Sequence, residues 1–171
     1  YYLCGDANPK AFGGFGTTLT AYGFDLSVSF IYSLGGKAYD TGYARLMASP
    51  FAAAERRNLH KDLWNAWSED NTNSDIPRFQ YGDTQNAYNS DRFLVSASSL
   101  TFKNLSLGYT LPQAWVSKLS LTSVRVYCMC DNLYYWTARK GLDPRNSLTG
   151  SVSITNFHPI RSISGGITVK F

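Results

Sequence analysis

The feature that most constrains the fold of this chain is an alternation of apolar and polar residues with a period of two. It is clearest from residue 24 to residue 34, where serines occupy most of the polar positions. The apolar positions of this stretch are Phe24, Leu26, Val28, Phe30, Tyr32 and Leu34. Because successive side chains of a β-strand point to opposite faces, the stretch predicts a strand with one wholly apolar face.

The same alternation recurs along the chain and predicts an all-β fold. We expect strands over about residues 13–22, 24–34, 98–111, 122–136 and 161–171. The connection around Tyr22 and Gly23 is short enough for a hairpin. The apolar parity changes at Lys103 and Asn104, and a slip of one residue predicts a β-bulge there. The expected architecture is an antiparallel meander of about five long strands.

The connections between these strands are alternately long and short. The stretches 35–97 and 137–159 are long, whereas those near 22–25 and 112–121 are short. Strands of roughly ten residues with this asymmetry are typical of a transmembrane β-barrel, whose extracellular loops are long and whose periplasmic turns are short. A soluble secreted carbohydrate-binding module with an all-β sandwich fold is the alternative, because its strands alternate in the same way. It does not explain the asymmetry of the connections.

One helix is expected inside the longer connection. Ser49 suits the position that caps a helix, and Pro50 suits its first turn. Leu59, Leu63 and Trp67 then recur at helical spacing. We therefore expect a helix from about Pro50 to Trp67, within a loop on the extracellular side.

Composition and motifs argue against several classes of function. The net charge is +4, but the basic residues are scattered, so we expect no nucleic-acid partner. The sequence contains no run of 18 apolar residues, so it predicts no transmembrane helix. His60 and His158 have no ligand-type spacing around them, and the sequence lacks the nucleophile elbow of the α/β-hydrolases. We therefore expect no enzyme activity, no metal and no cofactor.

Several segments of the chain resemble, in order, the C-terminal part of the SusC/RagA family of TonB-linked outer-membrane transporters of Bacteroidetes. The resemblance covers nearly the whole chain from about Gly5 onward. The segments are "GGFGTTLTAYGFDLSVSFIYSLGGKAYD", "NTNSDIPRF", "SDRFLVSASSLTFKNLSLGYTLP", "VRVYCMCDNLYYWT", "KGLDPR" and "GGITVKF". Cys128 and Cys130 stand where the family more often has Val and Gly, and we interpret them as small residues that are packed or face lipid.

The resemblance implies a 22-stranded transmembrane β-barrel closed by a plug, of which this chain is the C-terminal part. It also implies import of glycans or peptides with energy from the TonB system, a SusD-like surface lipoprotein as lid, and insertion into the outer membrane by the barrel assembly machinery. In such barrels the final strand carries the assembly signal, here Ile167, Val169 and Phe171. Five strands are fewer than the roughly eight of the smallest known barrels, which agrees with a piece of a larger wall.

Two sets of side chains are candidates for function. Three charged residues, Lys103, Arg125 and Asp131, are expected to face the lumen, where they would meet the plug or water. The aromatic set is Trp64, Trp67, Tyr134, Tyr135 and Trp136. These rings could bind sugars or other cargo, or they could pack on the barrel rim and form the interfacial aromatic girdle. The girdle is the favoured interpretation, since it is expected whatever the cargo.

Overall fold

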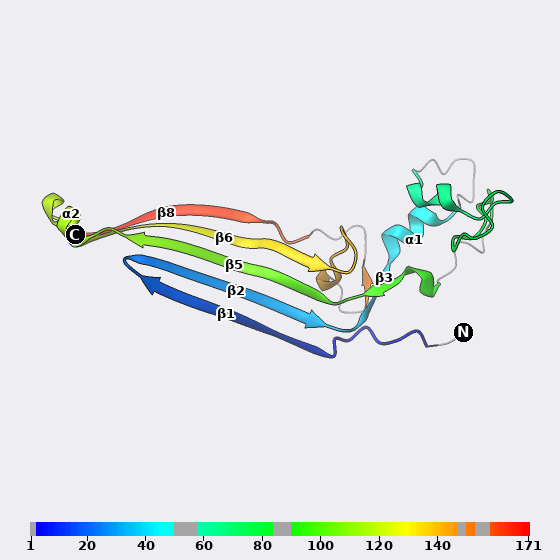
Figure 1. Cartoon of the computed structure of the whole chain (residues 1–171), viewed down its shortest axis with the longest axis horizontal. Helices are drawn as coiled ribbons and strands as arrows, with labels where there is room; N and C mark the ends of the chain where they lie inside the picture. The colour runs from blue at the N-terminus through cyan, green and yellow to red at the C-terminus, as the bar shows by residue number, and fades with distance from the viewer. Residues whose placement is uncertain (1–2, 50–57, 84–89, 147–149, 153–157) are drawn as a thin grey trace.

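The computed structural model describes residues 3–49, 58–83, 90–146, 150–152 and 158–171. Its main element is a five-stranded sheet in the order β1-β2-β5-β6-β8, in which all neighbouring strands are antiparallel. The strands are β1 (Ala11–Ala21), β2 (Phe24–Leu34), β5 (Ser99–Thr110), β6 (Ser123–Thr137) and β8 (Ser162–Lys170). Figure 1 shows them lying side by side as one elongated meander. The expected all-β meander is confirmed.

The register of the sheet gathers the apolar residues on one face. One row across the strands consists of Leu19, Leu26, Leu107 and Cys128. In a second row, the ring centroids of Phe15 and Phe30 are 5.1 Å apart and those of Phe30 and Phe102 are 4.7 Å apart. Aromatic pairs on adjacent strands stabilise a sheet, so these contacts help to hold the register. Serine, threonine and charged residues occupy most of the opposite face, which we call the polar face.

The bulge expected at Lys103 and Asn104 is confirmed. Phe102 pairs with Phe30 and Asn104 pairs with Ser29, so Lys103 has no residue opposite it on β2. The register between β5 and β6 shifts at the same place. The extra residue allows the apolar parity of β5 to change while its side chains stay on the same face of the sheet.

The two short connections lie at the same end of the sheet. Tyr22 and Gly23 connect β1 to β2, and both have positive φ angles, 51° and 85°. Two-residue hairpin loops favour this backbone conformation because it follows the twist of the strands. The second connection contains a short helix, α2 (Gln113–Val116), followed by a 3₁₀ turn, η4 (Ser117–Leu119).

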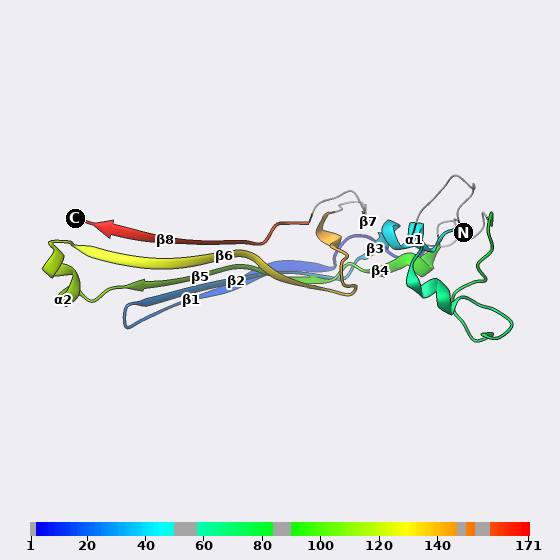
Figure 2. The same ribbon diagram turned by 90° about the horizontal axis from the view of Figure 1, so that it is seen from above.

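The five-stranded sheet is a single layer, and no other described element covers either face of its long central part (Figures 1 and 2). Many of its apolar side chains are consequently exposed. Examples are Phe15, Leu19, Leu107, Val126, Ile163 and Ile167. The sheet therefore does not enclose its apolar face in a core of its own, as the strands of a soluble sandwich would.

A second unit, which we call the loop module, lies at the end of the sheet opposite to α2 (Figure 1). It consists of the described residues between 35 and 97 and between 138 and 161. Its elements are β3 (Lys37–Asp40), α1 (Thr41–Met47), η1 (Lys61–Asn65), η3 (Asp91–Phe93), β4 (Leu94–Ser96), η5 (Pro144–Asn146) and β7 (Ser151–Val152). The strands form a small sheet in the order β4-β3-β7, in which β3 and β7 run parallel.

The loop module contains most of the buried apolar residues that the structure describes. Ala38, Leu142 and Val152 form a cluster, against which Val95 and Ala97 pack. Phe93 and Met47 are also buried. These residues come from both long connections, so the small core joins two loops that are far apart in the sequence.

The helix expected from Pro50 to Trp67 is wrong over the part that the structure describes, and residues 50–57 lie outside that part. Only η1 forms there, as a 3₁₀ helix. The carbonyl oxygen of Asn65 accepts hydrogen bonds from the side chains of Asn71 and Ser74, so side chains of the following loop take the place of a continuing helix.

The helix that does form earlier in this connection, α1, was not expected. Asp40 begins it, because its carboxylate accepts a hydrogen bond from the backbone N–H of Tyr43 at 2.8 Å. Within the described ranges, no helix is long and apolar enough to cross a membrane.

Candidate functional site

Arg125 lies on the polar face and pairs with Asp25 across an intervening strand. Its Nε donates to Asp25 Oδ1 at 2.9 Å, and its Nη2 contacts Asp25 Oδ2. The two residues come from β6 and β2, and Gly108 of β5 lies between them. A Cβ atom on Gly108 would lie 2.5 Å from the nearest atoms of both side chains. The glycine is therefore what lets this ion pair bridge three strands.

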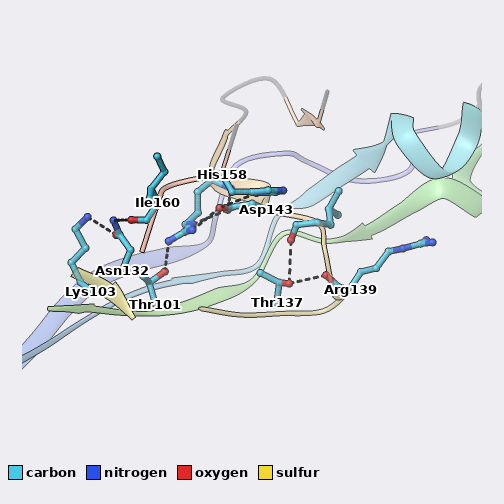
Figure 3. A network of polar contacts seen from close by, with 10 residues as sticks. Thr101, Lys103, Asn132, Thr137, Arg139, Asp143, His158 and Ile160 are labelled. Atoms are coloured by element: carbon cyan, nitrogen blue, oxygen red, sulfur yellow. Dashed lines mark hydrogen bonds and ion pairs between the residues drawn. The ribbon is translucent and has the colours of Figure 1, made fainter. Parts of the chain in front are cut away.

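Lys103 and Asp131 lie together at the bulge, away from Arg125. Lys103 Nζ donates to Asn132 Oδ1 at 2.8 Å, and Asn104 Nδ2 donates to Asp131 Oδ1 at 2.8 Å. Asn132 has a φ angle of 51°, and its amide also donates to the carbonyl oxygen of Ile160 at 3.2 Å. Figure 3 shows Lys103, Asn132 and Ile160 on the same side of the sheet. The three charged candidates thus belong to two separate groups of contacts.

The aromatic candidates are divided among different surfaces. Trp64 on η1 is 91% exposed, and Trp67 follows it in the same loop. Tyr134 pairs with Phe102, and Trp136 pairs with Leu100, on the apolar face. The ring centroids of Tyr134 and Trp136 are 4.8 Å apart.

Tyr135 differs from its two neighbours because it pairs with Thr101, whose hydroxyl is on the polar face. The guanidinium of Arg145 lies 5.0 Å from the centroid of the Tyr135 ring. Tyr135 therefore contacts the loop module, whereas Tyr134 and Trp136 lie on the apolar face of the sheet.

Asp143 and Arg145 attach the loop after β6 to the polar face through Thr101; Figure 3 shows Asp143 and Thr101 on the same side of the sheet. Arg145 Nε donates to Asp143 Oδ1 at 2.7 Å, and its Nη1 donates to Thr101 Oγ1 at 2.8 Å. The Nδ1 atom of His158 lies 3.7 Å from Asp143 Oδ2, and the His158 ring stacks on Tyr135 at 6.3 Å. The loop is thus folded over the sheet.

Asp143 is fully buried, and its ionisation is tuned by these neighbours. Burial alone raises the pKa of its carboxyl group. The hydrogen bonds from the side chain and backbone of Arg145, with the charges of Arg145 and His158, more than offset this and lower the pKa below its usual value. The segment "KGLDPR" contains this residue, but its sequence alone did not indicate a buried ionic contact.

A cavity of about 330 Å³ lies between α1 and the loop after β6. The residues that line it include Asp40, Tyr43, Leu46, His60, Arg139 and Lys140. The guanidinium of Arg139 lies 3.6 Å from the centroid of the Tyr43 ring, and its Nε lies 3.2 Å from Asp40 Oδ2. None of these residues except His60 was noted from the sequence.

Tyr43 contributes a polar group beside this cavity. Its hydroxyl donates to Asp62 Oδ2 at 2.7 Å, and its ring packs edge to face against that of His60 at 4.8 Å. Burial of Tyr43 raises the pKa of its phenol, and the hydrogen bond to Asp62 raises it further. The described residues contain no group of three His, Cys, Asp or Glu side chains that could hold a metal ion.

Two curated relatives match nearly the whole chain. TonB-dependent receptor P3 of Formosa agariphila is 30% identical over 179 residues, which cover 99% of this chain and 17% of the relative. TonB-dependent receptor P26 of the same organism is 26% identical over 181 residues, with 99% and 18% covered. No family model matches the chain.

Solved structures with the same fold include those of a peptide importer. The RagAB peptide importer in its closed-closed state superposes with a TM-score of 0.79 at 28% identity, covering 96% of this chain and 18% of that chain. The open-open state gives a TM-score of 0.77 at 28% identity, with 96% and 17% covered. A further RagAB peptide transporter structure gives 0.76 at 30% identity, with 94% and 17% covered.

These matches extend over both the sheet and the loop module, because they cover at least 94% of the chain. The chain spans 17% to 18% of the length of the curated relatives. By name, the relatives are receptors and peptide importers rather than enzymes. The chain is a segment of a SusC/RagA-like TonB-dependent transporter, a β-barrel protein of the outer membrane.

Proposed function

We propose that this chain is barrel wall in an importer that carries nutrients, peptides or glycans, across the outer membrane with energy from the TonB system. The observation that carries the proposal is the single-layer sheet, whose apolar face has no covering layer among the described residues. Lipid supplies the missing apolar phase in a barrel, and the polar face then lines the lumen. The similarity to TonB-dependent receptors and to a peptide importer supports this function.

The soluble carbohydrate-binding module is less well supported. Such a module needs a second layer to cover its apolar strands, because exposed apolar patches of this extent are rare on soluble monomers. Exposed examples on the sheet include Phe15 at 56%, Ile163 at 69% and Ile167 at 67%. The buried apolar residues of the loop module lie at one end of the sheet and do not cover this face.

The orientation and partners follow from the same proposal. The loop module faces the extracellular side and the end with α2 faces the periplasm, since external loops are longer than periplasmic turns. Lys103, Arg125 and Asp131 face the lumen. A SusD-like surface lipoprotein is the partner on the outer side, consistent with the two-component name of the RagAB importer. Trp64 and Trp67 belong to the outer loops, whereas Tyr134 and Trp136 form part of the aromatic girdle.

Strand β8 carries the assembly signal in this proposal. Ile167 and Val169 alternate along β8, and Phe171 follows the strand with 92% of its surface exposed. β8 lies at one edge of the described sheet, so its outer hydrogen-bonding groups need a partner strand in lipid. Recognition of these side chains by the assembly machinery would precede that pairing.

The proposal is tested in the full-length transporter that contains this chain. We expect it to fractionate with the outer membrane and to require TonB for uptake, measured with labelled oligopeptides and labelled oligosaccharides in parallel. Uptake of one class alone would identify the cargo. Recovery of the full-length protein in the soluble fraction would contradict the proposal.

A second experiment tests the assembly signal. Phe171→Ala should lower the amount of folded protein in the outer membrane, measured by the mobility shift of unheated samples. Phe12→Ala is the matched control, because Phe12 is also an exposed aromatic, 78% exposed, on the other edge strand. Equal losses in the two variants would show that Phe171 has no special role.

A further inference from the structure

The cavity between α1 and the loop after β6 has the size and composition of a small binding site. Its volume of about 330 Å³ is within the range of small-molecule sites, about 300–1,000 Å³. Tyr43, Leu46 and His60 come from the first long connection and line it together with Arg139 and Lys140, which follow β6. The site thus combines aromatic and apolar groups with cationic ones.

The walls of this cavity are held in place by contacts of their own. Thr137 Oγ1 lies 2.8 Å from the carbonyl oxygen of Arg139 and 3.2 Å from that of Leu142. Leu142 is buried in the core of the loop module. On the other side, Asp40 caps α1 through Tyr43. A ligand would therefore meet a largely preformed site, which reduces the entropic cost of binding.

The charges around the cavity favour an anionic ligand. Asp40 is the acidic residue among the lining groups, and both of its oxygens are engaged, one by the Tyr43 N–H and the other by Arg139. Lys140 is exposed, and its ammonium makes no ion pair or hydrogen bond with the other described residues. Arg139 offsets the carboxylate of Asp40, so Lys140 supplies the net positive charge among these lining groups.

We propose that this cavity binds a carboxylate group of the transported cargo, with Lys140 as its main ionic partner. The inference rests on the proposed function, because it treats the loop module as a surface that cargo meets first. Peptides carry carboxylates at their C-terminus and on acidic side chains, and acidic glycans carry them on uronic acid residues. The apolar side chain of Leu46, which lines the cavity, packs against the part of the cargo next to the carboxylate.

The test uses the full-length transporter, purified in detergent, and two pairs of probes. One pair is a tetrapeptide that ends in glutamate and its amidated glutamine analogue. The other is trigalacturonate and its methyl ester. Titration calorimetry should show tighter binding of the acidic member of at least one pair, and the pair that discriminates identifies the source of the carboxylate.

The decisive variant is Lys140→Gln, which removes the charge and keeps most of the side-chain length. We expect it to weaken binding of the acidic probe about tenfold, as expected for loss of a charge-assisted contact, and to leave the neutral probe unchanged. Lys118→Gln is the matched control, since Lys118 is an exposed lysine on η4 at the opposite end of the sheet.

Three results would overturn the inference: no preference for the acidic probe in either pair, no effect of Lys140→Gln, or an equal effect of Lys118→Gln. TonB-dependent uptake of neutral cargo with no charge preference would refute this site and leave the proposed function standing. Absence of the full-length protein from the outer membrane would instead refute the function itself.

Discussion

The five-stranded sheet and the loop module differ in how far their apolar side chains are buried within the chain itself. In the loop module, Phe93 is 1% exposed and Met47 is 2% exposed. On the sheet, Ile167 is 67% exposed and Ile163 is 69% exposed, although both belong to regular strand. The module buries its own core, whereas the sheet needs an external apolar phase. The difference indicates that one region faces water and the other faces lipid on one side.

The largest expected effect comes from placing a charge on the apolar face. Leu105→Arg puts a cation opposite Val28 and Cys130, both on that face. An arginine near the middle of a lipid-facing strand costs about 2–4 kcal/mol. We expect a loss of this size in the free energy of unfolding, measured by urea titration of the full-length protein in lipid vesicles.

The neighbouring substitution Ser106→Arg is the control for this prediction, because Ser106 belongs to the polar parity and pairs with Ser27 and Met129. It should cost much less than Leu105→Arg. If the two variants are equally destabilised, the apolar face does not meet lipid.

A smaller and local effect is expected in the loop module. Asp143→Asn keeps the shape of the side chain and removes its charge, so Arg145 loses its charge-assisted hydrogen bonds. We expect a local cost of about 2 kcal/mol, typical of hydrogen bonds to a charged group. Hydrogen exchange should become faster at residues 138–146 and stay unchanged in the sheet. Faster exchange across both regions would show that the two are not independent.

Gly108→Ala tests how the polar face of the sheet is held together. The added methyl would lie 2.5 Å from the nearest atoms of Asp25 and Arg125, so the ion pair must open. Because both partners are partly exposed, we expect only a small loss of stability, less than for Asp143→Asn. Thermal unfolding of the full-length protein measures it.

The matched variant for this comparison is Gly165→Ala. The added methyl would lie no closer than 3.5 Å to its nearest neighbour, the carbonyl oxygen of Tyr127. The stability of this variant should therefore not fall. A similar loss in both variants would mean that strand glycines act through the backbone and that the ion pair contributes nothing measurable.

The smallest expected effect is a dependence of the loop module on pH. Despite burial, the pKa of Asp143 in the folded protein is held below its usual value by Arg145, so its ionised form stabilises the fold at pH values above that usual pKa. This contribution is lost as the pH falls through the lower, folded pKa. The hydrogen-exchange protection factors of residues 138–146 should therefore fall in acid. In Asp143→Asn the acid-induced change should disappear, and its persistence would assign the effect to another group.

Local pattern was sufficient to predict much of the sheet. The alternation in β2 predicted its two faces, and the change of parity at Lys103 predicted the bulge. The same reasoning failed over residues 58–67, where the spacing of Leu63 and Trp67 resembles a helix but side chains of the following loop engage the carbonyl of Asn65. Alternation along the strand separates Tyr135 from Tyr134 and Trp136, but only the structure shows that Tyr135 contacts Arg145 and His158.

The amino-acid sequence alone was enough to predict which face of each strand is apolar, because the period of two is a local property of the extended backbone. It could not specify that Tyr43 meets Arg139, or that Arg145 reaches Thr101, because these contacts join segments far apart in the sequence. Such contacts depend on how two long loops pack at one end of the sheet. Only the folded structure reveals the cavity they enclose and the buried carboxylate of Asp143 beside the sheet.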